Sequence, residues 1–357
     1  MKSDFTPFKI GTVFNPINIK AEIPKYRFVK ISYPSRLNAM ALDSSKITHN
    51  DNLQYSPGEI LFKVKLYKEV TIEVTDSPKF DISETSHRKP LILHSAIIMR
   101  KALGFKNGLK IFVKNNHDIR HVGLGSSSGL IASVACAINE LYGNPINKEI
   151  LLQYLAQNHG EEIANNIIEL SPVQCIGGSA AAGLYKGGLI ILAGKSKVIY
   201  SAVISDKFKI VIGIPKNFQK LDAQTLLEQE IKSFPKFIKC GLKYSPKIAY
   251  SLIHNVLPSL KDNNLKPLGD LIYDYRFKMG SINNCSYCYK KLSIVANKIA
   301  CIKEKNIAEI LSLSSVGPSF FALTDKTAEC IKIFNKANLR TIVTDVENHT
   351  YSILGKF

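Results

Sequence analysis

The sequence contains no long apolar segment, no apolar leader and no even set of cysteines. No run of about 18 apolar residues occurs in it, and its first residues lack the apolar core that a signal peptide needs. The seven cysteines are an odd number, which argues against the disulfide framework of a secreted protein. Cys285 and Cys288 form one C-x-x-C motif without a second pair, so we expect ordinary buried or half-buried thiols rather than a zinc or redox site. We expect a soluble, cytoplasmic protein without a membrane partner.

The positive charge of the chain is large but diffuse. The formal net charge is +18 over 357 residues. The lysines are spread along the whole chain, and no block of five or more basic residues occurs. A protein that binds nucleic acid concentrates such residues in a patch, so this distribution argues against a nucleic-acid partner. A general positive field would instead attract a small phosphorylated substrate.

The order of the predicted elements indicates an α+β protein with two domains. Residues 1–28 have no clear period and are expected to form an irregular extension. Strands are predicted at 28–33, 60–66, 70–74, 109–113, 189–193, 208–214, 340–344 and 350–354, and helices at 91–103, 130–142, 148–158, 222–234, 246–260, 264–279, 289–303 and 327–337. Helices and strands alternate without a strict βαβ repeat. We place the boundary near residue 215, between an N-terminal domain of 29–214 and a C-terminal domain of 215–357.

One segment rich in glycine and serine leads directly into a predicted helix. Residues 119–129 read IRHVGLGSSSG, and the apolar, small-residue pattern of 130–137 follows at once. Backbone N–H groups and the helix dipole converge on an anion at such a helix start, most often a phosphate. The segment is not a Walker A motif, because no lysine lies near Gly129, and its spacing also differs from that of a dinucleotide-binding fingerprint. It predicts an enzyme that handles phosphate groups.

Three consecutive hydroxyls, those of Ser126, Ser127 and Ser128, stand between the glycines of this segment. Serines at a helix start can simply cap free N–H groups, but three serines with three glycines exceed what capping requires. They are placed to surround a diphosphate or triphosphate and to offer a hydroxyl to its Mg²⁺. Glu161 or Glu162 is the candidate carboxylate ligand. The alternative is that these two residues begin a helix and complement its dipole.

Three segments in a fixed order resemble the motifs of the GHMP kinase superfamily. They are residues 33–43 (YPSRLNAMALD), the phosphate loop at 121–129, and residues 314–323 (SSVGPSFFAL). The resemblance extends over roughly residues 30 to 355. It implies a two-lobe fold, with an N-terminal lobe similar to domain 2 of ribosomal protein S5 and a ferredoxin-like α/β C-terminal lobe. It also implies an enzyme that acts on a small phosphorylated substrate, and it is compatible with a homodimer.

Within the superfamily the details resemble the β-ribofuranosylaminobenzene 5′-phosphate synthases. The shared features are the sequence PSR at 34–36 with an acidic residue at Asp43, the sequence SSVGP at 314–318, and an Ile-Gly pair at 176–177 ahead of the Gly-Gly pair at 187–188. This likeness implies transfer of a phosphoribosyl group from phosphoribosyl diphosphate to 4-aminobenzoate or 4-hydroxybenzoate. Diphosphate and CO₂ would be released, in the synthesis of a methanopterin-like cofactor. Such a reaction needs stabilisation of the leaving diphosphate, by loop N–H groups, hydroxyls and Mg²⁺, more than it needs a strong base.

The segment before the Gly-Gly pair lacks a carboxylate that many GHMP kinases carry. Those kinases have an aspartate within a Ser-Gly-x-Asp element, whereas residues 176–180 read IGGSA and no carboxylate lies between Glu169 and Asp206. An ATP-dependent small-molecule kinase stays an alternative, since positioning and electrostatics can carry phosphoryl transfer. ATP would then be needed in addition to Mg²⁺. An inactive ligand-binding homologue on the same scaffold is a second alternative.

The resemblance assigns the candidate site residues to four roles. The candidate phosphate- or nucleotide-binding residues are Gly123, Leu124, Gly125, Ser126, Ser127, Ser128, Gly129, Ser315 and Gly317. The candidate substrate-binding residues are Asn38, Gly177, Gly178 and Ser179, the candidate catalytic residues are Arg36, Asp43 and His121, and the candidate metal ligands are Ser127 and Glu161. The planar guanidinium of Arg36 would grip a phosphate or carboxylate, and its alternative is a surface ion pair with Asp43. His121 would donate to a phosphate or act as an acid, and its alternative is an ordinary surface histidine.

Overall fold

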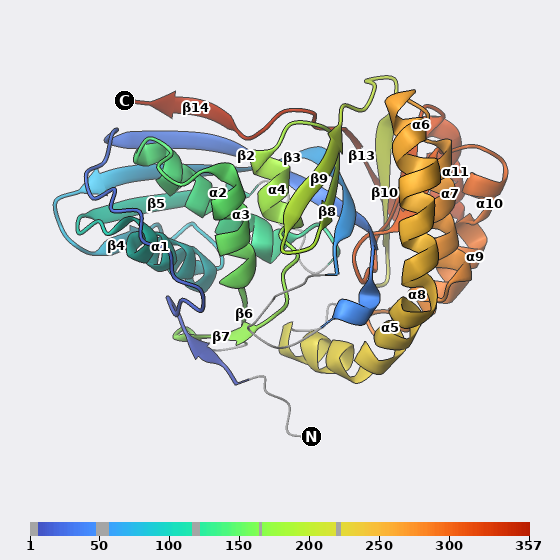
Figure 1. Ribbon diagram of the computed structural model, residues 1–357, viewed down its shortest axis with the longest axis horizontal. Coiled ribbons are helices and arrows are strands. Elements are labelled where there is room, and N and C mark those ends of the chain that lie inside the picture. The colour runs from blue at the N-terminus through green and yellow to red at the C-terminus, as the bar shows by residue number, and fades with distance from the viewer. Residues whose placement is uncertain (1–5, 48–56, 116–121, 164–165, 219–222) are drawn as a thin grey trace.

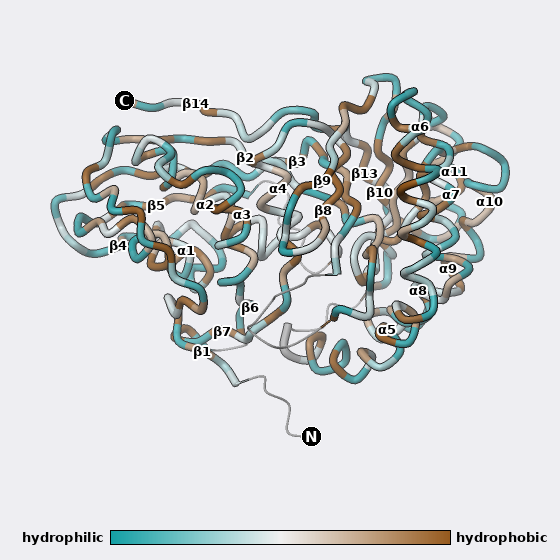
Figure 2. The backbone as a smooth tube through the Cα atoms, viewed as in Figure 1, coloured by the Kyte–Doolittle hydropathy of each residue, from teal (hydrophilic) through white to brown (hydrophobic). Residues whose placement is uncertain are grey.

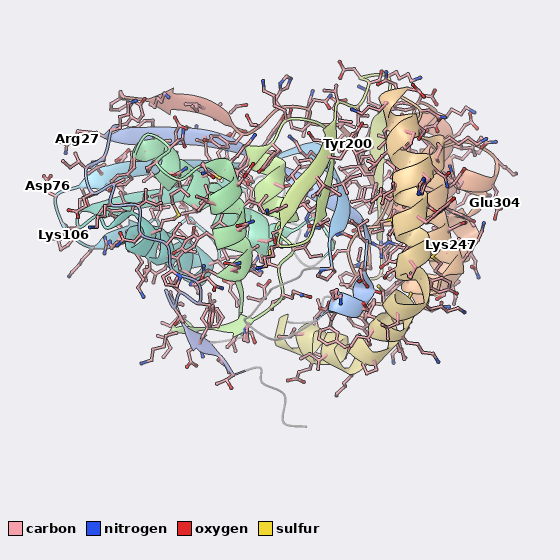
Figure 3. All side chains as sticks on the ribbon, viewed as in Figure 1. Arg27, Asp76, Lys106, Tyr200, Lys247 and Glu304 are labelled. Carbon is pink, nitrogen blue, oxygen red and sulfur yellow. The ribbon has the colours of Figure 1, made fainter. Side chains whose placement is uncertain are left out.

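The computed structural model describes residues 6–47, 57–115, 122–163, 166–218 and 223–357. Two lobes lie side by side in it (Figure 1). Apolar segments run through the inner strands and helices of both lobes (Figure 2). Charged side chains such as Lys247 and Glu304 point outward from the helices of the C-terminal lobe (Figure 3). None of the described helices is long and apolar enough to cross a membrane.

The N-terminal lobe is built on a seven-stranded sheet. Its strands are β14 (Ser352–Lys356), β2 (Phe28–Ala41), β3 (Glu59–Thr75), β5 (Gly108–Asn115) and β4 (Phe80–Ile82) in spatial order, with β8 (Leu189–Ala193) and β9 (Lys197–Ala202) extending from β3. Strand β3 replaces the two strands predicted at 60–66 and 70–74. The strand is continuous because Lys68, which interrupts the apolar pattern, is buried and donates a hydrogen bond to Ser35 Oγ at 3.1 Å.

Four helices belong to this lobe; three contact the sheet, and the third in chain order packs against the fourth. They are α1 (Lys89–Leu103), α2 (Ser126–Leu141), α3 (Lys148–Gln157) and α4 (Gly178–Leu184). Almost every residue of α2 is buried, and small side chains such as Ala132 and Ala135 allow α1 and the strands to approach it closely. Helix α2 begins at Ser126 rather than at the predicted Leu130, because the serines of the loop form its first turn.

The first described residues are attached to the N-terminal lobe. Strand β1 (Phe8–Lys9) pairs with β7 (Glu169–Pro172), which in turn pairs with β6 (Gly160–Glu162). Side chains that follow β1, among them Ile17, pack against the core of the lobe. The segment that we predict as an irregular extension therefore has little regular structure but covers apolar surface.

The C-terminal lobe follows a β-α-β-β-α-β order. The spatial order of its antiparallel sheet is β11 (Ile310–Leu313), β12 (Phe320–Thr324), β10 (Lys209–Pro215) and β13 (Leu339–Asp345). The helices are α5 (Ala223–Ser251), α6 (Leu257–Lys261), α7 (Lys266–Tyr273), α8 (Ser281–Asn284), α9 (Leu292–Ile299), α10 (Cys301–Glu304) and α11 (Thr327–Lys336). This arrangement is ferredoxin-like. The α+β class and the two-lobe fold that we predict are confirmed.

The strand pairings cross the boundary that we place at residue 215. Strand β10 ends there but pairs with β12 and β13, and β14 returns to the N-terminal lobe to pair with β2. The apolar pattern of a buried strand does not reveal which sheet it joins, which is why the sequence misplaces β10. The lobes share one apolar cluster, in which the rings of Phe62 and Phe321 meet edge to face with centroids 5.9 Å apart. This shared cluster fixes the two lobes against each other.

Candidate active site

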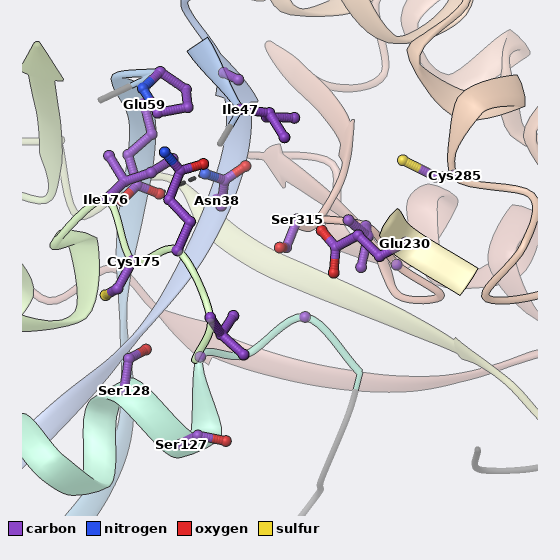
Figure 4. Close-up of a pocket in the computed structure, with 18 of the residues that line it drawn as sticks. Asn38, Ile47, Glu59, Ser127, Ser128, Cys175, Ile176, Glu230, Cys285 and Ser315 are labelled. Atoms are coloured by element: carbon purple, nitrogen blue, oxygen red, sulfur yellow. Dashed lines mark hydrogen bonds between the residues drawn. The ribbon is translucent and has the colours of Figure 1, made fainter. Parts of the chain in front are cut away.

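A cleft with a volume of about 300 Å³ lies between the two lobes. Its N-terminal wall contains the start of α2 and the neighbouring parts of β2 and β3, and its C-terminal wall contains α5 and the turn between β11 and β12. Figure 4 shows Ser127 and Ser128 on the first wall and Glu230 and Ser315 across from them. The predicted residues that line the cleft are Arg36, Asn38, Gly123, Leu124, Gly125, Ser126, Ser127, Ser128, Glu161, Gly177, Ser315 and Gly317. The three motifs therefore meet in one place.

The loop before α2 is held against the turn between β11 and β12. Gly123 and Gly125 have φ angles of 85° and 63°, a left-handed conformation that glycine adopts without strain. A Cβ on Gly123 would lie 2.3 Å from the carbonyl oxygen of Ser314, so a larger residue does not fit there. The Ser314 hydroxyl donates to the carbonyl of Gly123 at 2.7 Å. The second and third motifs thus form one continuous wall.

Helix α2 starts at the cleft without a capping side chain. Its N-cap is Gly125, which has no side chain to make a capping hydrogen bond. Ser126, Ser127 and Ser128 form the first turn and line the cleft. An uncapped helix start offers backbone N–H groups and the positive end of the helix dipole to an anion. The geometry suits a phosphate group rather than the capping role that we considered for the serines.

Arg36 of β2 brings a guanidinium to the same place. A Cβ on Gly125 would lie 3.1 Å from Arg36 Nε, so the guanidinium lies directly against the loop. The Nε and Nη1 atoms of Arg36 are buried and have no hydrogen-bond partner among the described residues. Buried N–H groups are normally paired, so these two are available to a ligand in the cleft.

Asp43 is not the partner of Arg36. Its carboxylate accepts hydrogen bonds from the backbone N–H of Ser45 at 3.0 Å and from Ser245 Oγ at 2.7 Å. It caps the short 3₁₀ turn Ser44–Lys46 and is not among the described residues that line the cleft. Its position supports a structural role, joining the end of β2 to helix α5.

A buried carboxylate that we do not predict, that of Glu59, lies in the cleft. Glu59 is the first residue of β3 and only 1% exposed. Its Oε2 accepts a hydrogen bond from Asn38 Nδ2 (Figure 4). Asn38 is oriented in turn by Arg276, whose Nη2 donates to Asn38 Oδ1 at 3.3 Å and whose Nε donates to the carbonyl of Ala39 at 2.7 Å. Asn38 therefore positions a carboxylate as well as lining the cleft.

The Glu59 carboxylate lies where a side chain on residue 178 would be. A Cβ on Gly178 would come within 2.1 Å of Glu59 Oε1. Glycine at 178 thus makes room for the carboxylate, in the segment that carries no carboxylate of its own. Gly178 and Ser179 lie behind the cleft surface: Ser179 Oγ shares a hydrogen bond of 2.7 Å with Ser128 Oγ. Both residues support the site rather than line it.

The predicted metal ligands are already joined by an arginine. Glu161 and Glu162 lie in strand β6, so the interpretation that they begin a helix is wrong. Glu161 forms an ion pair with Arg88 Nη2, and Glu162 forms one with Arg88 Nε at 2.6 Å. Arg88 Nη2 also donates to Ser127 Oγ at 2.9 Å. Because the guanidinium bridges Ser127 and Glu161, these residues do not fit a Mg²⁺ ion held between them. Nor do the described residues contain a cluster of three or more histidine, cysteine, aspartate or glutamate side chains suited to a metal.

Two further predicted residues lie away from the cleft surface or outside the described part. Gly129 is inside α2, where a Cβ would lie 3.2 Å from Lys68 Nζ. A glycine there lets the buried lysine pass beneath the helix. His121 lies outside the described residues, so its proposed role as a donor or acid stays a prediction.

The C-terminal wall of the cleft is mostly apolar. The residues of α5 that face the cleft include Leu226, Leu227, Phe234 and Phe237. Glu230 interrupts this surface, and burial raises its pKa from the ordinary value of 4.5 to about 7. The cleft therefore has groups suited to an anion on its N-terminal side and an apolar surface on its C-terminal side.

One histidine and two cysteines of the cleft are neutral at pH 7. Burial lowers the pKa of His159 to about 4. Burial also raises the thiol pKa of Cys175 to about 11 and that of Cys285 to about 12. All seven cysteines are free, so the expectation of ordinary thiols agrees with the structure.

The fold and the site define a two-lobe protein with a cleft between the lobes. Residues 90–168 match the family described as GHMP kinases N terminal domain. The chain is 24% identical over 260 residues to beta-ribofuranosylphenol 5′-phosphate synthase of Archaeoglobus fulgidus, covering 69% of this chain and 76% of the relative.

Solved structures of GHMP enzymes have the same fold. Homoserine kinase of Cytophaga hutchinsonii superposes with a TM-score of 0.59 at 15% identity, covering 93% of this chain and 99% of that one. Mevalonate kinase of L. major gives 0.60 at 13% identity, covering 92% and 99%. Mevalonate pyrophosphate decarboxylase of Streptococcus pyogenes gives 0.61 at 14% identity, covering 92% and 98%.

Residues 90–168 thus resemble the N-terminal domain of GHMP kinases, and the whole chain shares the fold of the solved homoserine and mevalonate kinases. The resemblance that the three motifs indicate is thereby confirmed. The matched relatives are kinases, a decarboxylase and a synthase, which confirms the expectation of an enzyme.

Proposed function

We propose that the protein is a phosphoribosyl-transferring synthase of the β-ribofuranosylaminobenzene 5′-phosphate synthase type. Its substrates would be phosphoribosyl diphosphate and an aromatic acid, either 4-hydroxybenzoate or 4-aminobenzoate. The observation that carries the proposal is the division of one cleft into an anion-binding side and an apolar side. The name of the archaeal relative, a ribofuranosylphenol 5′-phosphate synthase, agrees with it. A place in methanopterin-like cofactor synthesis and a cytoplasmic location belong to the same proposal.

The proposed reaction replaces one bond at the ribose by another. The bond between C1 of the ribose and the diphosphate oxygen breaks, and its electron pair leaves with the diphosphate. The ring carbon that carries the carboxylate forms a bond to C1. The bond from that carbon to the carboxylate then breaks, CO₂ leaves, and the electron pair restores the aromatic ring. No proton is gained or lost overall.

The N-terminal wall supplies the groups that this reaction needs at the ribose and the diphosphate. The N–H groups at the start of α2, the serine hydroxyls beside them and the unpaired N–H groups of Arg36 would stabilise the leaving diphosphate. The carboxylate of Glu59 would face the positive charge that develops on the ribose. No step is assigned to a metal, because Arg88 already bridges Ser127 and Glu161.

The C-terminal wall suits the aromatic acid. Leu226 and Phe234 offer an apolar surface against which a benzoate ring can pack. A small polar alcohol would gain little from such a surface. The apolar wall therefore favours an aromatic acceptor over the acceptors that many small-molecule kinases use.

An ATP-dependent small-molecule kinase is the second candidate. The likeness in fold to homoserine kinase and mevalonate kinase, over at least 92% of the chain, favours it. The loop would then clamp the β- and γ-phosphates of ATP, and Glu59 would accept the proton of the acceptor hydroxyl. The unpaired N–H groups of Arg36 and the positioned carboxylate of Glu59 argue against an inactive ligand-binding homologue.

Thermal unfolding with ligands separates these candidates, because a ligand that binds only the native state raises the melting temperature. We expect phosphoribosyl diphosphate with Mg²⁺ to raise it and ATP with Mg²⁺ to leave it unchanged. The Arg36→Met variant is the matched control, since it should lose the response to phosphoribosyl diphosphate. Stabilisation by ATP alone would overturn the synthase proposal in favour of a kinase.

A further inference from the structure

We propose that Arg88 takes the place of a protein-bound divalent cation at the phosphate loop: it makes the Ser127 hydroxyl a hydrogen-bond donor to phosphate and neutralises Glu161. Arg88 is thus a positioning residue that acts through Ser127. The inference rests on the proposed binding of a phosphate group in the cleft, but not on the synthase reaction. It corrects the prediction that Ser127 and Glu161 bind Mg²⁺.

The hydrogen bonds of Arg88 determine what Ser127 can do. The Ser127 oxygen accepts an N–H from Arg88 Nη2 at 2.9 Å. A hydroxyl that binds a metal does so through a lone pair of its oxygen, whereas a hydroxyl that binds an anion donates its proton. Arg88 Nη2 occupies one of the two lone pairs of Ser127 Oγ, and its positive charge opposes a cation at the other, so the hydroxyl is left to donate its proton on the cleft side.

The charge of Arg88 offsets one of the two carboxylate charges that would otherwise repel a phosphate. Its side chain is 5% exposed, and those of Glu161 and Glu162 are 16% and 24% exposed. Burial by itself lowers the pKa of the Arg88 guanidinium, but the charges of the two carboxylates outweigh this and raise it. The guanidinium therefore stays charged and meets two carboxylates that are shielded from water.

The backbone holds Arg88 in an unusual conformation. Its φ angle is 62°, in the left-handed region that favours glycine, at the N-cap of α1. A side chain persists in this region where its surroundings over-determine it, commonly at functional sites. Here the four side chains that bind the guanidinium supply that constraint: Ser126, Ser127, Glu161 and Glu162.

Binding of Mn²⁺ to the full chain, without nucleotide, tests the proposal. The variants are Arg88→Met, which removes the charge but keeps an apolar side chain of similar length, and the double variant Arg88→Met/Glu161→Gln. Titration calorimetry or electron paramagnetic resonance would measure Mn²⁺ binding. We expect the wild type and the Glu161→Gln variant to bind Mn²⁺ equally, because Glu161 does not bind the ion in the wild type. Arg88→Met should gain one site, with at least tenfold tighter Mn²⁺ binding than the wild type, and the double variant should lose it. A site in the wild type that Glu161→Gln abolishes would overturn the proposal, as would a folded Arg88→Met protein without a new site.

Binding of inorganic diphosphate gives a second readout that does not depend on folding of Arg88→Met. We expect Ser127→Ala to weaken it about five- to tenfold, equally with EDTA and with Mg²⁺. In the Mn²⁺ titration, the conservative variant Arg88→Lys keeps the positive charge and should, like the wild type, gain no Mn²⁺ site. An effect of Ser127→Ala that appears only with Mg²⁺ would overturn the proposal. Absence of synthase activity alongside the expected metal and diphosphate results would refute the proposed reaction and leave the role of Arg88 intact.

Discussion

The two walls of the cleft differ in chemistry and in how readily the sequence reveals them. The N-terminal wall is built from an uncapped helix start, two arginines and a buried glutamate. The C-terminal wall is built from the leucines and phenylalanines of α5, with Glu230 among them. Binding an anion requires a backbone geometry that few residue types adopt. The N-terminal wall is therefore marked in the sequence by a motif of glycines and serines. An apolar wall uses residues that also form any core, so nothing in the sequence marks it.

The largest effect that we expect is that of Arg36→Met. It removes two buried N–H groups that face the anion-binding side and leaves no other guanidinium with unpaired groups there among the described residues. Loss of such donors to a developing charge should reduce kcat/KM about 1000-fold. Steady-state kinetics with phosphoribosyl diphosphate measure this. A decrease of less than tenfold would show that Arg36 does not contact the phosphate groups.

Glu59→Gln should have the second largest effect. The amide keeps the shape of the side chain but removes the negative charge, so kcat should fall about 100-fold with a small change in KM. Gly178→Ala is the matched second variant. The added Cβ would lie 2.1 Å from Glu59 Oε1 and would therefore displace the carboxylate without removing its charge. Both variants should show the same loss of kcat. Full activity of either one would remove Glu59 from the reacting groups.

Phe234→Leu should affect the other wall alone. It shortens the apolar surface and should raise the KM for the aromatic acid about fivefold, while the KM for phosphoribosyl diphosphate stays unchanged. Kinetics with each substrate varied in turn check this. An increase in the KM for phosphoribosyl diphosphate instead would show that the two walls do not bind different substrates.

Glu230→Gln should have the smallest effect, on stability against pH. The pKa of Glu230 is raised from 4.5 to about 7 in the folded protein, so between these values the folded state holds a proton that the unfolded state has lost. The contribution of Glu230 to stability therefore falls as pH rises through this range. The variant should remove part of that fall, a change of about a few degrees in melting temperature. Identical profiles of melting temperature against pH for the variant and the wild type would show that the Glu230 carboxyl is exposed to water and has an ordinary pKa.

More of the fold than of the site could be predicted from the sequence. Strand and helix patterns locate most elements, and the three motifs imply the two lobes. Helix α5 was predicted as two helices, because Pro235 and Pro246 lie within it and proline usually ends a helix. Its apolar face packs against the rest of the C-terminal lobe and outweighs that local preference.

Within the site, Glu59 and Arg88 could not be predicted. Glu59 stands at the start of an ordinary apolar strand and Arg88 in a polar segment before α1, and only the folded chain brings them to the loop. Glu161 was named as a candidate carboxylate ligand, but its partner Arg88 was not predicted. Charges that pair across long sequence separations leave no local pattern, which is why the sequence does not show that Arg88 joins Ser127 and Glu161.

Release of CO₂ tests the central claim, that one cleft joins a phosphate-bearing substrate to an aromatic acid. The purified protein would be incubated with 4-hydroxybenzoate or 4-aminobenzoate labelled at the carboxyl carbon. We predict that labelled CO₂ appears together with an equal amount of diphosphate when phosphoribosyl diphosphate is present, and that Arg36→Met abolishes both. Formation of ADP from ATP and a small alcohol, without any labelled CO₂ from either acid, would contradict the account.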